Sequence, residues 1–207
     1  MARPVWAEIN LDNLAHNIRE VRRLVDGKAL ITAVIKADGY GHGASVIGRT
    51  LLDNGADRFA VATFSEAMEL RGIYPETPIF VLGYTQEEDF FLAEKNNIIL
   101  TIYEYAQAKY IVENKMKISV HLKIDTGMGR LGFRPDDQDI EKTVMLNDLH
   151  IEGIYTHFAK ADETDKTFTH LQVERFEGVL KKIENLGIEI PIKHVSNSAG
   201  IIDFPEY

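Results

Sequence analysis

Short apolar runs, rich in β-branched residues, recur at intervals along the whole chain. Runs that are apolar at nearly every position are typical of strands buried on both faces. Polar or glycine-containing segments bound each of them, as expected for strand ends. We therefore predict seven buried strands, at residues 30–35, 58–62, 78–82, 98–102, 118–124, 151–158 and 192–196.

The segments between these runs have helical spacing. The clearest stripe is the last, made by Val173, Phe176, Leu180 and Ile183 before Gly187. A stripe of this kind predicts an amphipathic helix, and a glycine just after it predicts the end of that helix. Similar signals punctuate earlier segments: Thr63 and Glu66 with capping-box spacing, and Gly55 and Gly72 as expected helix ends.

Buried strands joined by helical crossovers predict a parallel sheet, in either an eight-stranded α/β barrel of the TIM type or a doubly wound fold. We favour the barrel, because no G-x-G-x-x-G follows the first strand and polar residues gather at strand carboxyl ends, where a barrel builds its active site. A complete barrel has eight strands in ~250 residues. We therefore expect an incomplete (β/α)8 barrel with about seven of its eight strands.

The first ten residues stand apart from this alternation. Residues 5–9 could form a strand, but it has no place in the barrel count. The helix that follows would carry an apolar stripe of Leu11, Leu14, Ile18, Val21 and Val25. We predict a stray strand within residues 1–10 and the barrel over residues 11–207.

Composition excludes several classes of protein. The formal net charge is −9, spread along the chain, which argues against a nucleic-acid partner. There is no cysteine for a disulfide or a thiolate site. The first residues lack the build of a signal peptide, and no apolar stretch approaches the ~20 residues of a membrane-spanning helix. We expect a cytoplasmic protein with no membrane partner.

The most informative segment is residues 33–43, where an apolar strand ends on Lys36 and enters a loop with three glycines. Lys36 shares a strand face with Thr32 and Val34, so in a barrel it would project into the mouth. A partly desolvated lysine amine can attack a carbonyl and form a Schiff base. From position alone, it is equally plausible that the Lys36 side chain simply extends from the strand end into water.

These eleven residues resemble the pyridoxal-phosphate attachment motif of alanine racemases, V-x-K-A-[DN]-[GA]-Y-G-H-G, without a mismatch. The resemblance implies that Lys36 holds pyridoxal 5'-phosphate covalently. It also implies that Tyr40 hydrogen-bonds the cofactor phosphate.

A second cluster places His121, Lys123 and Asp125 on alternate positions of one strand, and we expect this polar set to face the barrel interior. The D-T-G-M-G-R-L-G run that follows resembles the same racemases, in which the arginine matching Arg130 binds the substrate carboxylate. The lysine matching Lys123 is carbamylated in some members of that family. An ordinary ion pair of Lys123 with Asp125 or a neighbour is the alternative.

Two further strand ends carry similar runs. A lone histidine on a strand is usually a satisfied core residue, but T-H-F-A resembles the racemase segment whose histidine, here His157, stacks on the cofactor ring. Asn197 and Ser198 before a helix could be capping residues alone. H-x-x-N-S-A also resembles the family run in which the serine contacts the phosphate with the asparagine nearby, and the backbone N–H groups of a helix start suit an anion.

The resemblance extends from about residue 6 to residue 207. It implies an isomerase that interconverts L- and D-alanine and supplies D-alanine for peptidoglycan. It also implies a homodimer with a carboxyl-terminal β domain, to which the stray first strand belongs and which the chain lacks. The base opposite Lys36 is a tyrosine of the partner subunit in this family, so we expect little or no activity from the chain alone.

Two other interpretations remain open. One is a single-domain pyridoxal-phosphate carrier with the same barrel. The other is a metal-dependent hydrolase built on His121, Asp125 and His157, although the histidines lack the familiar metal-site spacings and we predict no metal.

Overall fold

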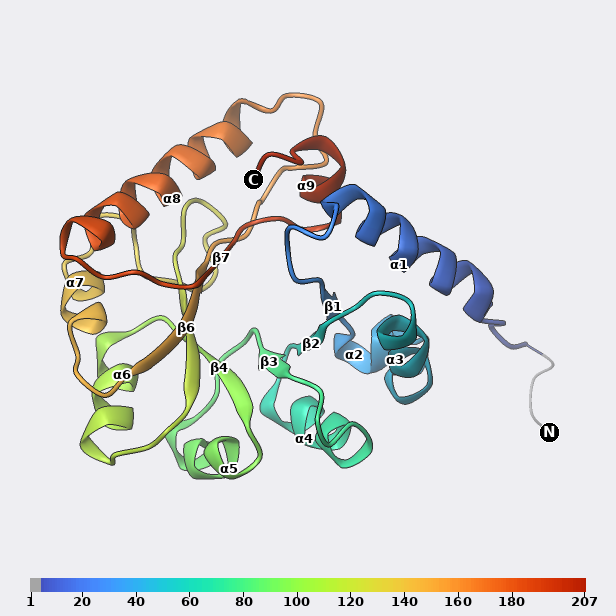
Figure 1. The fold of residues 1–207 in the computed structure, drawn as a ribbon, viewed down its shortest axis with the longest axis horizontal. Helices are drawn as coiled ribbons and strands as arrows, with labels where there is room; N and C mark the ends of the chain where they lie inside the picture. Colours follow the sequence, from blue (N-terminus) through green and yellow to red (C-terminus); the bar gives the residue numbers. More distant parts are fainter. Residues whose placement is uncertain (1–4) are drawn as a thin grey trace.

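The computed structural model describes residues 5–207 and contains one parallel sheet of seven strands (Figure 1). Each strand pairs in parallel with the next one along the chain. The strands are β1 (Thr32–Val34), β2 (Arg58–Val61), β3 (Ile79–Val81), β4 (Ile98–Ile102), β5 (Ser119–Lys123), β6 (His150–Tyr155) and β7 (Ile192–His194). The seven predicted strands and the barrel-type order are thus confirmed.

Helical segments connect the strands and cover the outer side of the curved sheet (Figure 1). The amino-terminal α1 lies beside α9 near the other end of the chain. The helical segments are α1 (Leu11–Val25), α2 (Lys36–Tyr40), α3 (Ala44–Asp53), α4 (Phe64–Ile73), the 3₁₀ turn η1 (Glu87–Asp89), α5 (Phe90–Lys95), α6 (Tyr105–Glu113), α7 (Asp139–Val144), α8 (Thr167–Asn185) and α9 (Ser198–Asp203).

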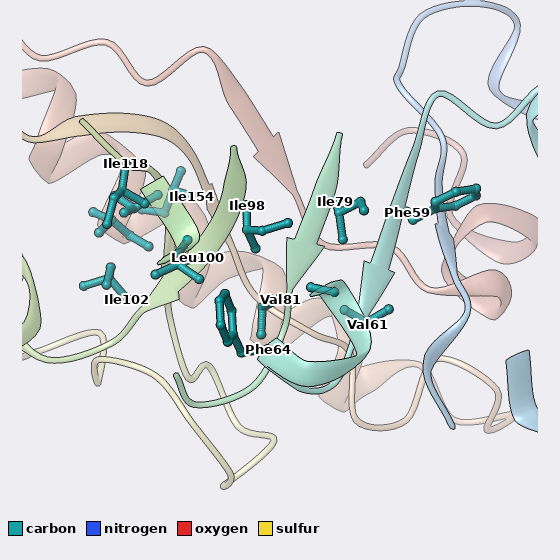
Figure 2. Packing of buried hydrophobic residues seen from close by; sticks show 14 of the residues in the cluster. Phe59, Val61, Phe64, Ile79, Val81, Ile98, Leu100, Ile102, Ile118 and Ile154 are labelled. Carbon is teal, nitrogen blue, oxygen red and sulfur yellow. The ribbon is translucent and has the colours of Figure 1, made fainter. Parts of the chain in front are cut away.

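The main core lies between the sheet and these helices. Outward-facing strand residues such as Phe59, Ile79 and Leu100 have no exposed surface. Figure 2 shows them packed in one cluster with Phe64 at the start of α4. Burial of both strand faces explains the unbroken apolar runs in the sequence.

The opposite face of the sheet encloses a smaller set of side chains. Ala60, Phe80, Ile99 and Tyr155 form a separate buried cluster there. These residues alternate with the outward-facing ones, as the pleat of a strand requires. Polar residues of β5 and β7 share this inner face, which is where the candidate site is built.

The sheet is open between β1 and β7, which are its two edges within residues 5–207. A cavity of about 670 Å³ lies there, lined by residues of both edges and of α8, among them Thr32, Phe176 and His194. Val34 on β1 is 41% exposed on the side that faces the interior. The structure is therefore a half-barrel with its inner face accessible from one side.

One predicted local feature is wrong, and one stays a prediction. Residues 5–9 have no ladder partner among the described strands, and Val5 and Trp6 are exposed; their assignment to a strand of a second domain stays a prediction. Residues 1–4 of that predicted segment lie outside the described residues. Gly72 does not end its helix, because α4 continues to Ile73.

The helix signals elsewhere are confirmed. Thr63 and Glu66 form a complete capping box at α4, and α8 ends just before Gly187, whose φ is +76°. The helices of residues 5–207 include none with the length and apolar character needed to cross a bilayer.

Candidate functional site

Lys36 begins a tight left-handed turn directly after β1. Ala37, Asp38, Gly39 and Tyr40 all have φ between +50° and +63°. A left-handed helical conformation costs an L-residue other than glycine roughly 1–2 kcal/mol. Three of these four successive residues are not glycine, so the surrounding contacts must hold the turn in place.

One residue of this turn, Gly39, has a φ of +63° and packs closely against α3. A Cβ on Gly39 would lie 2.5 Å from Ile47 Cδ1, so α3 packs directly against the turn. The Asp38 carboxylate accepts a hydrogen bond from the Ala44 N–H at 2.8 Å, and the Asp38 carbonyl accepts one from Gly43 at 2.9 Å. These contacts tie the turn to the first residues of α3.

Lys36 and Tyr40 lie at the two ends of the turn. The Lys36 amine is 5.9 Å from the centre of the Tyr40 ring. Lys36 is half-buried, whereas Tyr40 is 61% exposed. A phenol hydroxyl is therefore available close to the lysine amine.

Lys123, at the end of β5, is the second lysine of the inner face. It is 5% exposed, and its amine lies 4.3 Å from the centre of the Tyr155 ring. Burial and the nearby Arg130 guanidinium lower the pKa of Lys123 to about 7, although Asp125 acts in the opposite direction. The Asp125 carboxylate itself accepts hydrogen bonds from Gly127 and Gly129, so it shapes the loop that carries Arg130.

This lowered pKa makes the stability of the fold depend on pH. Between about pH 7 and the ordinary lysine value of 10.5, the unfolded chain binds more protons at Lys123 than the folded one. The free energy of unfolding should therefore rise with pH in this window. Lys123→Met lacks this titrating group. We therefore expect the free energy of unfolding of wild type, relative to that of Lys123→Met, to increase by on the order of 1–2 kcal/mol from about pH 7 to about pH 9.

Urea denaturation of both proteins at the two pH values measures this difference. Other titrating groups cancel in the comparison, because they are common to both proteins. With buffers free of carbon dioxide, so that Lys123 stays an unmodified amine, a difference that stays constant with pH would show that Lys123 keeps an ordinary pKa.

His157 follows β6 and lies at the same end of the sheet as the two lysines. Burial lowers the pKa of His157 to about 4, and the positive charges of Lys123, Arg130 and Lys36 act in the same direction. The imidazole is therefore neutral at pH 7. These four side chains, predicted from separate parts of the sequence, are thus close enough for their charges to act on His157.

Gln172 of α8 holds the segment around His157. It has no exposed surface; its amide nitrogen donates to the His157 carbonyl at 3.0 Å, and its oxygen accepts from the Ala159 N–H at 2.9 Å. The amide nitrogen also lies 3.1 Å from the Thr126 hydroxyl. Sequence reasoning missed Gln172, because a single glutamine in an amphipathic helix has no distinguishing spacing.

Asn197 and Ser198 lie where β7 leads into α9. The Asn197 carboxamide accepts a hydrogen bond from Gly200 N–H at 3.0 Å, so the capping interpretation is confirmed for this residue. Ser198 is the first residue of α9 and is exposed. Its hydroxyl is accessible at the carboxyl end of β7, and Lys36 lies at the carboxyl end of β1.

A chain of buried polar side chains continues below the site. His121 Nδ1 lies 2.9 Å from His194 Nε2, and the His194 ring stacks on Tyr155 with centres 4.7 Å apart. At the other end, the Arg58 guanidinium lies 3.1 Å from the Glu152 carboxylate, which is 3.5 Å from His121 Nε2. The predicted inward orientation of His121 is correct, whereas Arg58 and Glu152 were not predicted.

This arrangement does not support the metal-dependent interpretation. His121 contacts His194 and Asp125 contacts loop amides, so neither is directed toward His157. Residues 5–207 contain no group of three or more histidine and carboxylate side chains arranged to hold a metal ion.

Comparison with known proteins gives a consistent result. Residues 9–207 match the family described as "Alanine racemase, N-terminal domain". The chain is 46% identical to alanine racemase of Methanococcus maripaludis, over 100% of the chain and 57% of that protein. It is 48% identical to alanine racemase of Clostridium tetani, over 99% of the chain and 54% of that protein. The chain thus spans little more than half the length of these relatives.

Solved structures agree with this match. Alanine racemase of Clostridium difficile 630, in complex with cycloserine, superimposes with a TM-score of 0.93 at 41% identity, over 100% of this chain and 58% of that one. Alanine racemase of Bacillus anthracis with bound L-Ala-P gives a TM-score of 0.91 at 30% identity. This match covers 99% of this chain and 54% of that one. The motifs, the half-barrel and these matches together show that the chain belongs to the alanine racemase family and corresponds to its N-terminal domain.

Proposed function

We propose that this chain binds pyridoxal 5'-phosphate through Lys36 and forms the cofactor-bearing part of an alanine racemase that interconverts L- and D-alanine. The observation that carries the proposal is the left-handed turn at the end of β1, where the lysine of the attachment motif meets the mouth of the half-barrel. Lys123, Arg130 and His157 lie at the same end. The matched relatives are named alanine racemases.

The side chains at this end suit the chemistry of the cofactor. An amine (Lys36) can bond the aldehyde carbon. The Tyr40 phenol, the Ser198 hydroxyl and the backbone N–H groups at the start of α9 are donors for a phosphate, with Asn197 fixing that helix start. The neutral ring of His157 can stack on a pyridine without adding charge.

Bound pyridoxal phosphate supplies an electron sink that stabilises the charge left when an amino acid loses its Cα proton. In our proposal the Lys36 amine accepts or returns that proton on one face of Cα. The Arg130 guanidinium, a planar fork of donors, binds the substrate carboxylate.

Lys123 has a separate proposed role. Its pKa of about 7 leaves much of the amine neutral near physiological pH, and a neutral amine reacts with carbon dioxide. The resulting carbamate would carry a negative charge close to the Arg130 guanidinium. This ion pair would orient Arg130 toward the substrate.

The racemase as a whole is proposed to be a homodimer that produces D-alanine for peptidoglycan. In this proposal a residue from outside the barrel removes or returns the proton on the opposite face of Cα. Tyr40 is assigned to the phosphate rather than to this role.

Borohydride trapping tests the proposal directly. The 207-residue chain is incubated with pyridoxal phosphate, reduced with borohydride and digested, and the peptides are mapped by mass. We expect the pyridoxyl group on the peptide that contains Lys36. A label distributed over exposed lysines such as Lys28 and Lys109, with Lys36 unlabelled, would refute the proposal.

A further inference from the structure

The turn that carries Lys36 is held at its carboxyl end by hydrogen bonds to the segment just after it. At its amino end, one backbone N–H bonds a residue of a more distant helix. The Asp38 carbonyl and carboxylate bind the segment that leads into α3. The Ala37 N–H, which follows Lys36 directly, instead donates a hydrogen bond to Glu66 Oε1 at 2.6 Å. Glu66 is 29 residues away, in the first turn of α4.

Glu66 uses its second oxygen on the neighbouring strand. Oε2 accepts hydrogen bonds from the Ala62 N–H at 2.8 Å and from the Thr63 N–H at 3.1 Å. One carboxylate therefore connects the carboxyl end of β1 with the carboxyl end of β2. The capping box explains the bond to Thr63, but it does not explain the bond to Ala37.

Glu66 is held in its charged form. Burial raises the pKa of Glu66, but the backbone N–H groups of Ala37, Ala62 and Thr63 outweigh it and keep the pKa below its ordinary value. A charged acceptor makes a stronger hydrogen bond than a neutral one.

The Ala37 nitrogen belongs to the peptide group that joins Lys36 to Ala37. Fixing this peptide fixes the backbone rotation on the carboxyl side of Lys36 and holds Ala37 at its positive φ. We propose that Glu66 is the positioning residue of Lys36, directing its amine into the mouth of the half-barrel. This inference rests on the proposed role of Lys36 as the point of cofactor attachment.

Glu66→Gln tests the inference, because the side chain keeps its shape but has one acceptor oxygen in place of two. That oxygen cannot serve both Ala37 and the Ala62–Thr63 pair. We expect the equilibrium constant for formation of the pyridoxal-phosphate adduct at Lys36 to fall about tenfold or more. Hydrogen exchange of the Ala37 amide in the cofactor-free chain, measured by NMR, should become faster by a similar factor.

Thr63→Ala is the matched control. It removes the Thr63 hydroxyl that accepts the Glu66 N–H at 3.3 Å, but it leaves the contact of Glu66 with Ala37. We expect this variant to lose stability through the cap while keeping the wild-type adduct and Ala37 exchange. If Glu66→Gln fails to fold, Glu66→Asp, which keeps the charge but shortens the reach to Ala37, takes its place and should show the same two losses.

The outcomes distinguish the proposed function of Lys36 from the positioning role of Glu66. Wild-type chain that forms no adduct at Lys36 would overturn the proposed function, and this inference with it. Wild-type adduct formation that is unchanged in Glu66→Gln, or reduced equally in Thr63→Ala, would overturn the positioning role alone.

Discussion

Lys36→Ala is expected to reduce the borohydride-stable binding of pyridoxal phosphate to the background level of an unfolded chain. The side chain removed is the amine that the turn after β1 presents to the mouth of the half-barrel. The proposed phosphate donors Tyr40, Ser198 and the start of α9 remain in this variant, but they form no covalent bond. Absorbance of the bound cofactor, followed by peptide mapping, gives the measurement.

Lys123→Ala is the appropriate control, because Lys123 also faces the interior. Its pKa of about 7 leaves much of its amine neutral, and therefore nucleophilic, near neutral pH. However, it lies over the Tyr155 ring and is almost fully buried. We expect Lys123→Ala to retain the adduct at Lys36. Loss of the adduct in Lys123→Ala with retention in Lys36→Ala would reverse the assignment.

Glu152→Ala is expected to destabilise the fold by about 2–4 kcal/mol. The side chain of Arg58 is 10% exposed and that of Glu152 is 21% exposed, with 3.1 Å between their charged groups. His121 and Arg58 hold the pKa of Glu152 below its ordinary value, so the carboxylate is charged. Its removal leaves a buried guanidinium without a counter-charge. Urea denaturation followed by circular dichroism measures the loss.

The double variant Arg58→Met/Glu152→Met shows whether the charge or the packing is responsible. Replacing both members of a buried ion pair with apolar side chains of similar size is often close to neutral. We therefore expect the double variant to be more stable than Glu152→Ala. Equal losses in the two proteins would mean that packing around Glu152, rather than its pairing with Arg58, stabilises the interior.

Much of the fold could be predicted because strands buried on both faces have an unmistakable composition. The run from Ile98 to Ile102 was predicted at its observed bounds. The alternation in β5 also placed His121 and Lys123 correctly on the inner face, since a strand has a fixed period of two. The four motifs at strand ends could be brought together because parallel strands all end at one edge.

Glu152 shows why other features could not be predicted. Simple alternation places it on the same face as Ile154, which is buried in the outer core. The register of β5 and β6 shifts between Val120 and His121, where Ile151 and Gly153 are the successive partners, so the chain bulges at Glu152. A bulge of this kind redirects a side chain, and here it turns the carboxylate toward Arg58.

The left-handed turn after β1 could not be predicted from the sequence either. The sequence showed glycines after Lys36, but positive φ at Ala37, Asp38 and Tyr40 depends on contacts with α3 and α4 that no local pattern encodes. The stretch at residues 5–9 shows the converse situation. Its local pattern suits a strand, but a strand also needs a neighbour to pair with.

The strictly sequential order of the sheet has a consequence for how the protein is made. Each strand pairs with a neighbour in the sequence, so no pairing has to close the full length of the chain, and this lowers the entropic cost of each step. The parts that fix the lysine turn are β1, β2 and Glu66 of α4, and all of them lie within residues 32–73. These parts can therefore meet as soon as α4 has left the ribosome, before the later strands are made.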